Sequence, residues 1–145
     1  MTNASTIRLI LWKAAKAIEK ADHASIADSG LQLSEFAIME VLLHKGPLPI
    51  TLIGEKVLLT SGSMTAAVDR LVKKKLVKRI RNAEDRRSTR VHLTKSGRRT
   101  IEFAYRRHAA NLETIAAVLQ PHEKTELVRL LKKIGRHAEG LQPTG

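Results

Sequence analysis

The first third of the chain carries apolar side chains at the three- and four-residue spacing of amphipathic helices. Over residues 6–29 one apolar stripe consists of Ile7, Ile10, Leu11, Ala14, Ala15, Ile18 and Ala21. Gly30 then offers a left-handed stop. A second helix is expected over residues 34–46, with Ser34 as its N-cap. Its inward positions are Phe36, Met39, Val41, Leu42 and Leu43.

The middle of the chain predicts two short helices in close succession. Pro47 and Pro49 break the preceding pattern, because neither can donate a helix or ladder hydrogen bond. Residues 50–57 and 61–74 each show helical spacing, and Thr60 is a natural N-cap for the second. The second helix would bury Met64, Ala67, Val68, Leu71 and Val72. Such a pair of short, closely spaced helices matches a helix-turn-helix.

After this pair the pattern changes to that of short strands. Residues 76–81 and 89–93 are rich in β-branched and apolar types, and the polar loop 82–88 would join them as a hairpin. A helix-turn-helix followed directly by a hairpin is a winged helix. The predicted fold class is therefore mainly α with a small β-hairpin wing: a winged helix-turn-helix plus a helical dimerisation region.

Two helices are expected at the end of the chain. Thr94 caps a long one over residues 95–118, and Pro121 opens a last one that ends at Gly140. Together with the first helix they present more apolar surface than a winged helix of about sixty residues can cover. The stripes consist of Ile7, Ile10, Leu11, Ile18, Leu112, Ile115, Leu119, Leu127, Leu130, Leu131 and Ile134. They predict a homodimer, and the alternative is a purely intrachain core.

The elements divide the chain into three stretches within a single structural domain. We expect residues 1–29 to form an N-terminal dimerisation helix, residues 30–95 the winged helix-turn-helix, and residues 96–145 the C-terminal dimerisation helices.

The distribution of charge along the chain indicates what kind of partner the protein binds. The net charge of +12 is distributed as zero over residues 1–59, +11 over residues 60–107 and +1 over residues 108–145. So concentrated an excess indicates a docking surface for phosphates or anionic lipid, whereas the alternative is a solvated charged face.

Composition limits the core and the kinds of site. Aromatic residues make up only 3% of the chain, so the core must be aliphatic, and there is no cysteine for disulfides or thiolate zinc sites. Without a run of eighteen apolar residues or a signal peptide, a cytoplasmic protein is expected.

The exposed side of the helix over residues 61–74 suits a DNA major groove, where short side chains near a helix N-terminus read base edges. The expected reading face consists of Ser61, Gly62, Ser63, Thr65 and Ala66, and Arg70 and Lys73 are expected on the DNA backbone. Asp69 is expected to pair with a nearby arginine, and the alternative is that it accepts a hydrogen bond from an exposed cytosine amino group. Further phosphate contacts are expected from Lys74, Lys75, Lys78, Arg79 and Lys95. The alternative is that the serines only cap the helix and the lysines are solvated charges.

Residues 58–97, LLTSGSMTAAVDRLVKKKLVKRIRNAEDRRSTRVHLTKSG, resemble the recognition helix and wing of MarR-type transcriptional regulators. The segments AVDRL, LVKR, DRR and LTKSG follow the order and spacing of that family, and the flanking long helices are similar to its dimerisation element. Three positions depart from it: Lys75 and Leu58 stand where glycine is usual, and Gln120 where a Ser or Thr cap is common.

This resemblance implies a sequence-specific regulator of double-stranded DNA, namely a ligand-responsive repressor that binds a pseudo-palindromic operator as a homodimer. It implies that Arg87 of the wing enters the minor groove, that Asp85 directs this arginine, and that Arg86 contacts phosphate, with Arg90 extending the wing surface. It also implies a small aromatic or amphipathic effector beside Trp12, Phe36, Met39 and Tyr105, for which the alternative role is ordinary core.

Other functional classes lack support in the sequence. The six histidines are dispersed and form no metal-ligand pair, and no catalytic triad or glycine-rich phosphate loop is present, so no enzyme activity, metal or cofactor is expected. A membrane-surface protein would need an aromatic-rich amphipathic helix. A sequence-neutral architectural DNA- or RNA-binding winged helix stays open, because phosphate contacts carry no sequence information.

Overall fold

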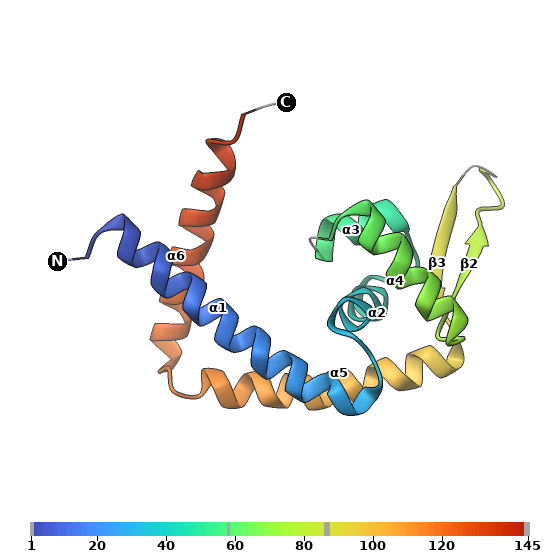
Figure 1. The fold of residues 1–145 in the computed structure, drawn as a ribbon, viewed down its shortest axis with the longest axis horizontal. Coiled ribbons are helices and arrows are strands. Elements are labelled where there is room, and N and C mark those ends of the chain that lie inside the picture. The colour runs from blue at the N-terminus through green and yellow to red at the C-terminus, as the bar shows by residue number, and fades with distance from the viewer. Residues whose placement is uncertain (1, 58, 86–87, 144–145) are drawn as a thin grey trace. The chain divides into compact units, whose positions relative to one another are not determined.

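The computed structural model describes residues 2–57, 59–85 and 88–143 in two compact units, Met1–Ala109 and Ala110–Gly145. The first unit holds every element of the predicted winged helix (Figure 1). In the described parts of the chain, no helix combines the length and the hydropathy needed to cross a bilayer.

The N-terminal segment forms α1 (Ala4–Ile26) and a short 3-10 turn, η1 (Ala27–Ser29). Gly30 follows with φ 77°, so the predicted left-handed stop is confirmed. Ile26 is the buried residue of α1, and the rest of this helix is half-buried or exposed.

The next helix is α2 (Leu33–Lys45), and its N-cap lies two residues before the expected one, so Ser34 as N-cap is wrong. The N-cap is Gln32, whose backbone N–H donates to the Glu35 carboxylate at 2.8 Å. A Glu three residues after the cap satisfies a donor that the helix itself leaves open, and this places Ser34 in the first turn. Ile38 is fully buried, whereas Val41, expected inward, is only half-buried.

The helix-turn-helix is confirmed as α3 (Ile50–Val57) and α4 (Ser61–Lys73), with Thr60 as the N-cap of α4. The Thr60 hydroxyl accepts from the backbone N–H of Ser63 at 3.2 Å, which satisfies one of the open donors of the first turn. Figure 1 shows α2, α3 and α4 gathered beside the hairpin.

The hairpin is confirmed as β2 (Val77–Arg81) and β3 (Thr89–Leu93), but the sheet has three strands. The segment between the helices forms β1 (Leu48–Pro49), which pairs antiparallel with β3 and gives the order β1-β3-β2. The sequence pattern missed β1, because two residues show no strand alternation and Pro49 lacks a donor.

The core of the first unit is aliphatic, as the composition predicted. Its fully buried side chains come from α1, α2, α3, α4, β2, β3 and α5 (Lys95–Ala116), and the largest apolar ones are Phe36, Ile26, Ile38, Met39, Leu42, Ile53, Leu71 and Ile101. Four of the five predicted inward residues of α4 are buried, and Val72 packs partly against the same cluster. The core therefore fixes which side of α4 faces outward.

A tight junction connects α4, β2 and α5. Lys75 ends α4 in the left-handed region at φ 62°, and the Leu76 N–H donates back to the Leu71 carbonyl at 3.0 Å. Thr94 caps α5 as predicted, since its hydroxyl accepts from the Gly97 N–H at 2.9 Å. Its backbone N–H donates to the Leu76 carbonyl at 3.1 Å, which ties the start of α5 to the start of β2.

Replacing Lys75 with glycine is expected to raise the free energy of unfolding by about 0.5–1 kcal/mol. The left-handed conformation costs a lysine roughly 1–2 kcal/mol, and the larger unfolded-state entropy of glycine returns about half of that gain. The midpoint of urea unfolding measures the change. Lys73→Gly is the matched control, because Lys73 is the last residue of α4 and glycine there should cost up to about 1 kcal/mol. Equal losses in both variants would contradict the strain at Lys75.

The second unit contains the end of α5 and α6 (Pro121–Gly140). Pro121 is at the start of α6 as predicted, and the Gln120 N–H donates to the Glu123 carboxylate at 2.8 Å, so this end is capped without Ser or Thr. No described residue of α6 is buried in the single chain.

Candidate nucleic-acid interface

The outward side of α4 carries the predicted reading face. Gly62, Ser63, Thr65 and Ala66 are all exposed, while Met64 between them is buried. The Ser61 side chain lies outside the described structure. Because the buried stripe locks the rotation of α4, these small residues are held together at the N-terminal end of the helix. The surface has the residue sizes that close approach to base edges requires.

Ser63 also takes part in the cap. Its hydroxyl oxygen accepts a hydrogen bond from the Thr60 hydroxyl at 3.0 Å, and its N–H donates to the same threonine. Ser63 can therefore take part in the N-cap of α4 and also contact a base edge, because its own hydroxyl proton can rotate toward another acceptor.

Two cations that are predicted to contact phosphate also meet a buried carboxylate within the protein. The Lys74 ammonium lies 3.0 Å from both carboxylate oxygens of Glu35, and Arg70 Nε lies 3.7 Å from one of them. Glu35 is fully buried, whereas the Lys74 and Arg70 side chains are 40% and 38% exposed. Their phosphate contacts stay predictions, and the single negative charge of Glu35 balances one of the two positive charges within the protein.

Asp69 pairs with Arg79, which confirms the prediction that this aspartate meets a nearby arginine. Arg79 Nη2 donates to Asp69 Oδ1 at 2.5 Å, across from α4 to β2. The ion pair balances a negative charge on the reading side of α4. It also links β2 to that helix, as an exposed pair of small energy.

The hairpin presents a second group of cations. Lys78 and Arg81 on β2 and Arg90 on β3 are exposed, and β2 and β3 align Lys78 with His92. Burial, followed by the charges of Lys78 and Arg90, lowers the pKa of His92 below its ordinary value. His92 is therefore neutral at pH 7, and the positive potential of this strand pair comes from lysine and arginine.

The tip of the wing is organised by its own backbone. The Asn82 N–H donates to the Ser88 carbonyl at 2.8 Å, and the Ser88 N–H donates to the Asp85 carbonyl at 3.0 Å. Asp85 is exposed, and Arg86 and Arg87 lie outside the described residues. Their predicted roles in the minor groove and on phosphate are taken up below.

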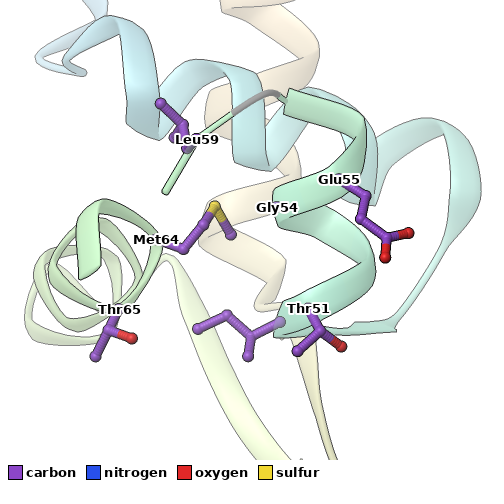
Figure 2. A pocket seen from close by; sticks show the side chains of 7 residues that line it. Thr51, Gly54, Glu55, Leu59, Met64 and Thr65 are labelled. Atoms are coloured by element: carbon purple, nitrogen blue, oxygen red, sulfur yellow. The ribbon is translucent and has the colours of Figure 1, made fainter. Parts of the chain in front are cut away.

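A pocket of about 270 Å³ lies between α3 and α4 (Figure 2). Met64 points from α4 toward Gly54 of α3, where an added methyl group would lie 3.2 Å from the Met64 side chain. Thr51, Glu55 and Thr65 stand around this contact. Glycine at this position allows the two helices to approach closely.

The four residues expected around an effector are in different environments. Phe36 and Met39 are 2% and 0% exposed within the core, Tyr105 packs against its margin, and Trp12 is 56% exposed on α1. Phe36 also meets the ring of His108 edge-on at 4.9 Å between centroids. In the single chain, Phe36 and Met39 fill the core, so Trp12 and Tyr105 are the more accessible of the four.

Sequence reasoning did not assign a role to this histidine. His108 is only 7% exposed, and its Nδ1 lies 3.1 Å from the Ser25 hydroxyl. Its Nε2 lies 3.7 Å from the Asp22 carboxylate, so the residue connects α1 to α5. Its polar partners lie some eighty residues away in the sequence, so no local pattern indicates them.

Comparison with known proteins decides the family. The sequence profile of the MarR family matches residues 31–89. The HTH-type transcriptional regulator MhqR of Bacillus subtilis is 35% identical over 131 residues, which cover 90% of this chain and 90% of MhqR. The chain belongs to the MarR family. It is therefore a DNA-binding transcriptional regulator with a winged helix.

Solved structures agree with this MarR fold. BpsR of Bordetella bronchiseptica superposes with a TM-score of 0.82 at 21% identity, over 93% of this chain and 96% of BpsR. AbfR in its overoxidised form bound to DNA gives a TM-score of 0.73 at 19% identity, over 93% of each chain. At this identity they support the fold alone.

The departures from the MarR pattern are explained locally. Lys75 adopts the left-handed conformation for which the family uses glycine, and Gln120 caps α6 together with Glu123. Leu58 lies outside the described residues. The Glu35 contacts are a further feature of this MarR chain that sequence reasoning missed, although a Glu before an apolar run is a known N-terminal signal.

Proposed function

We propose that this chain is a ligand-responsive repressor that binds a pseudo-palindromic operator as a homodimer. The observation that carries the proposal is the exposed reading face of α4, which has small side chains and is flanked by the exposed cations Lys73, Lys78 and Arg90. Bases are read by the small residues, while the cations supply the salt-dependent attraction to phosphate.

Two apolar stripes support the homodimer. On α1, Ile7, Leu11 and Ile18 are each about 40% exposed, a large fraction for isoleucine and leucine. On α6, the stripe of Leu127, Leu130, Leu131 and Ile134 is 40–46% exposed. Contiguous apolar surface of this kind marks a protein interface. A two-fold dimer would place two reading faces about one DNA turn, roughly 34 Å, apart, which matches a palindromic site.

The effector is proposed from the family and from BpsR, whose DNA binding is regulated by 6-hydroxynicotinic acid. We expect a small aromatic molecule here too, close to Trp12 and Tyr105. Such a molecule weakens DNA binding only if it binds more tightly to a dimer whose reading faces are wrongly spaced.

Selection of bound fragments from the source genome, followed by sequencing, tests the proposed function. The selected duplex and a scrambled duplex of equal composition are then compared at several salt concentrations. A repressor with an operator prefers the selected duplex by at least about 1000-fold. Equal affinity for both would instead identify a sequence-neutral binder.

Arg87→Ala is expected to weaken operator binding by about 1–3 kcal/mol, because it removes the proposed minor-groove contact of the wing. Affinity for the scrambled duplex should change far less. Lys78→Ala is the matched control, since loss of a phosphate contact lowers both affinities alike and reduces the salt slope by about one unit. Operator binding that is unchanged in the Arg87 variant would remove the wing from the interface.

A further inference from the structure

The carboxylate of Glu35 lies where three segments of the first unit meet. It accepts from the Gln32 N–H of its own helix at 2.8 Å. From α4, the Lys74 ammonium donates to both of its oxygens at 3.0 Å. The same ammonium donates to the Gly30 carbonyl at 3.2 Å, at the end of η1. A fully buried side chain thus joins the start of α2 to the end of α4, and its partner Lys74 also reaches the end of η1.

Arg70 depends on the same carboxylate. Its Nε is buried without a hydrogen bond among the described residues, and the Glu35 oxygen at 3.7 Å is its countercharge. Its Nη2 donates to the Ser34 hydroxyl at 3.3 Å, on the residue next to Glu35. Arg70 and Lys74 are four residues apart, so one face of the last turn of α4 is held at two points.

Stability alone does not require this arrangement. A buried ion pair has to offset a large desolvation cost, and apolar residues of similar size often serve stability as well. What directed, charge-assisted hydrogen bonds add is a defined orientation. Here the orientation is that of α4 on α2.

The length of α4 makes a small change in its tilt important for reading DNA. Helices rise 1.5 Å per residue, so the reading face lies roughly 15 Å from the Lys74 end of α4, and a tilt of about 5° moves it by about 1 Å. Hydrogen bonds to base edges lose most of their strength over such a displacement, whereas contacts to phosphate tolerate it.

We propose that Glu35 is a positioning residue for the recognition helix: it sets the tilt of α4 and thereby the discrimination between DNA sequences, without touching DNA. This role rests on the proposed function, because it requires a DNA sequence that α4 reads. The Gly30 carbonyl at the end of η1 also accepts from the Lys74 ammonium, so a movement of η1 would be passed to α4 through Lys74.

Glu35→Gln separates this role from simple electrostatics. The amide keeps the side-chain shape and an acceptor for the Gln32 N–H, but it removes a negative charge near the DNA-binding surface. Electrostatics alone would leave affinity for the operator and for a scrambled duplex unchanged or raise both by the same factor. A positioning role predicts about tenfold weaker operator binding with scrambled binding equal or stronger.

Glu40→Gln is the matched control, because it makes the same charge change on α2 and its carboxylate has no ion pair or hydrogen bond among the described residues. It should leave the operator-to-scrambled ratio of the wild type intact. If Glu35→Gln changes both affinities by one common factor, in either direction, the positioning role is overturned.

Circular dichroism checks that the variants fold. Should Glu35→Gln be unfolded, Glu35→Asp retains the charge and withdraws it by one methylene, and a lower operator-to-scrambled ratio is again expected, with an unchanged ratio overturning the role. A wild-type protein without any sequence preference would refute the proposed function itself. A wild-type preference that the Glu35 variants retain would refute only the role of Glu35.

Discussion

Gly97→Ala is expected to lower the free energy of unfolding by about 3 kcal/mol or more, a large part of the stability of a typical domain. A Cβ at this position would lie 1.9 Å from the Leu76 carbonyl oxygen and 2.8 Å from its carbon. The obstacle is backbone, and the Thr94 N–H donates to the same oxygen at 3.1 Å, so no side-chain rotation can relieve the clash. The first turn of α5 must therefore move away from β2.

Thermal unfolding measures this effect, with a midpoint lower by about 10 °C. Gly140→Ala is the matched control, because nothing lies within 4 Å of a Cβ added there, and its midpoint should stay close to that of the wild type. Similar midpoints for the two variants would show that the junction of α5 and β2 has room for a methyl group, which would contradict this prediction.

The second large effect is expected from glutamate at both Leu127 and Leu131, which should convert a dimer to monomers and weaken operator binding by at least about 100-fold. These side chains are 45% and 40% exposed in the single chain, so the substitution has little to disrupt within one subunit. Between subunits it would bury unpaired carboxylates, which is strongly unfavourable.

Sedimentation equilibrium gives the mass directly. The control is Lys132→Gln with Arg136→Gln, on the opposite side of α6. It lowers the net charge by the same two units, and this variant should sediment like the wild type. A glutamate variant that still sediments as a dimer would place the interface on another surface of the chain.

The sequence predicted the elements whose signals are local. Thr60 and Thr94 were assigned as N-caps because a hydroxyl before an apolar run satisfies open helix donors, and both hydroxyls accept the expected N–H groups. The left-handed conformation of Gly30 is predicted from its position after an apolar stripe, and the structure confirms it. Such features depend on neighbours a few residues away.

The rest depends on residues far apart in the sequence. The partners Lys74 and Glu35 are separated by 39 positions, and no pattern along either helix indicates that they meet. The strand β1 exists only because β3 lies beside it, since Leu48 and Pro49 have no alternation of their own. The pairing of Asp69 was expected, but the choice of Arg79 among many arginines required the register of the hairpin.

The two edge strands of the small sheet affect the tendency of this protein to aggregate at high local concentration. An exposed strand edge is a template on which other chains can aggregate. One outer strand, β1, is two residues long and contains a proline that cannot donate, and the other, β2, carries Lys78, Arg79 and Arg81. Like-charge repulsion and the missing donor therefore oppose edge-to-edge stacking, even where many copies gather along one stretch of DNA.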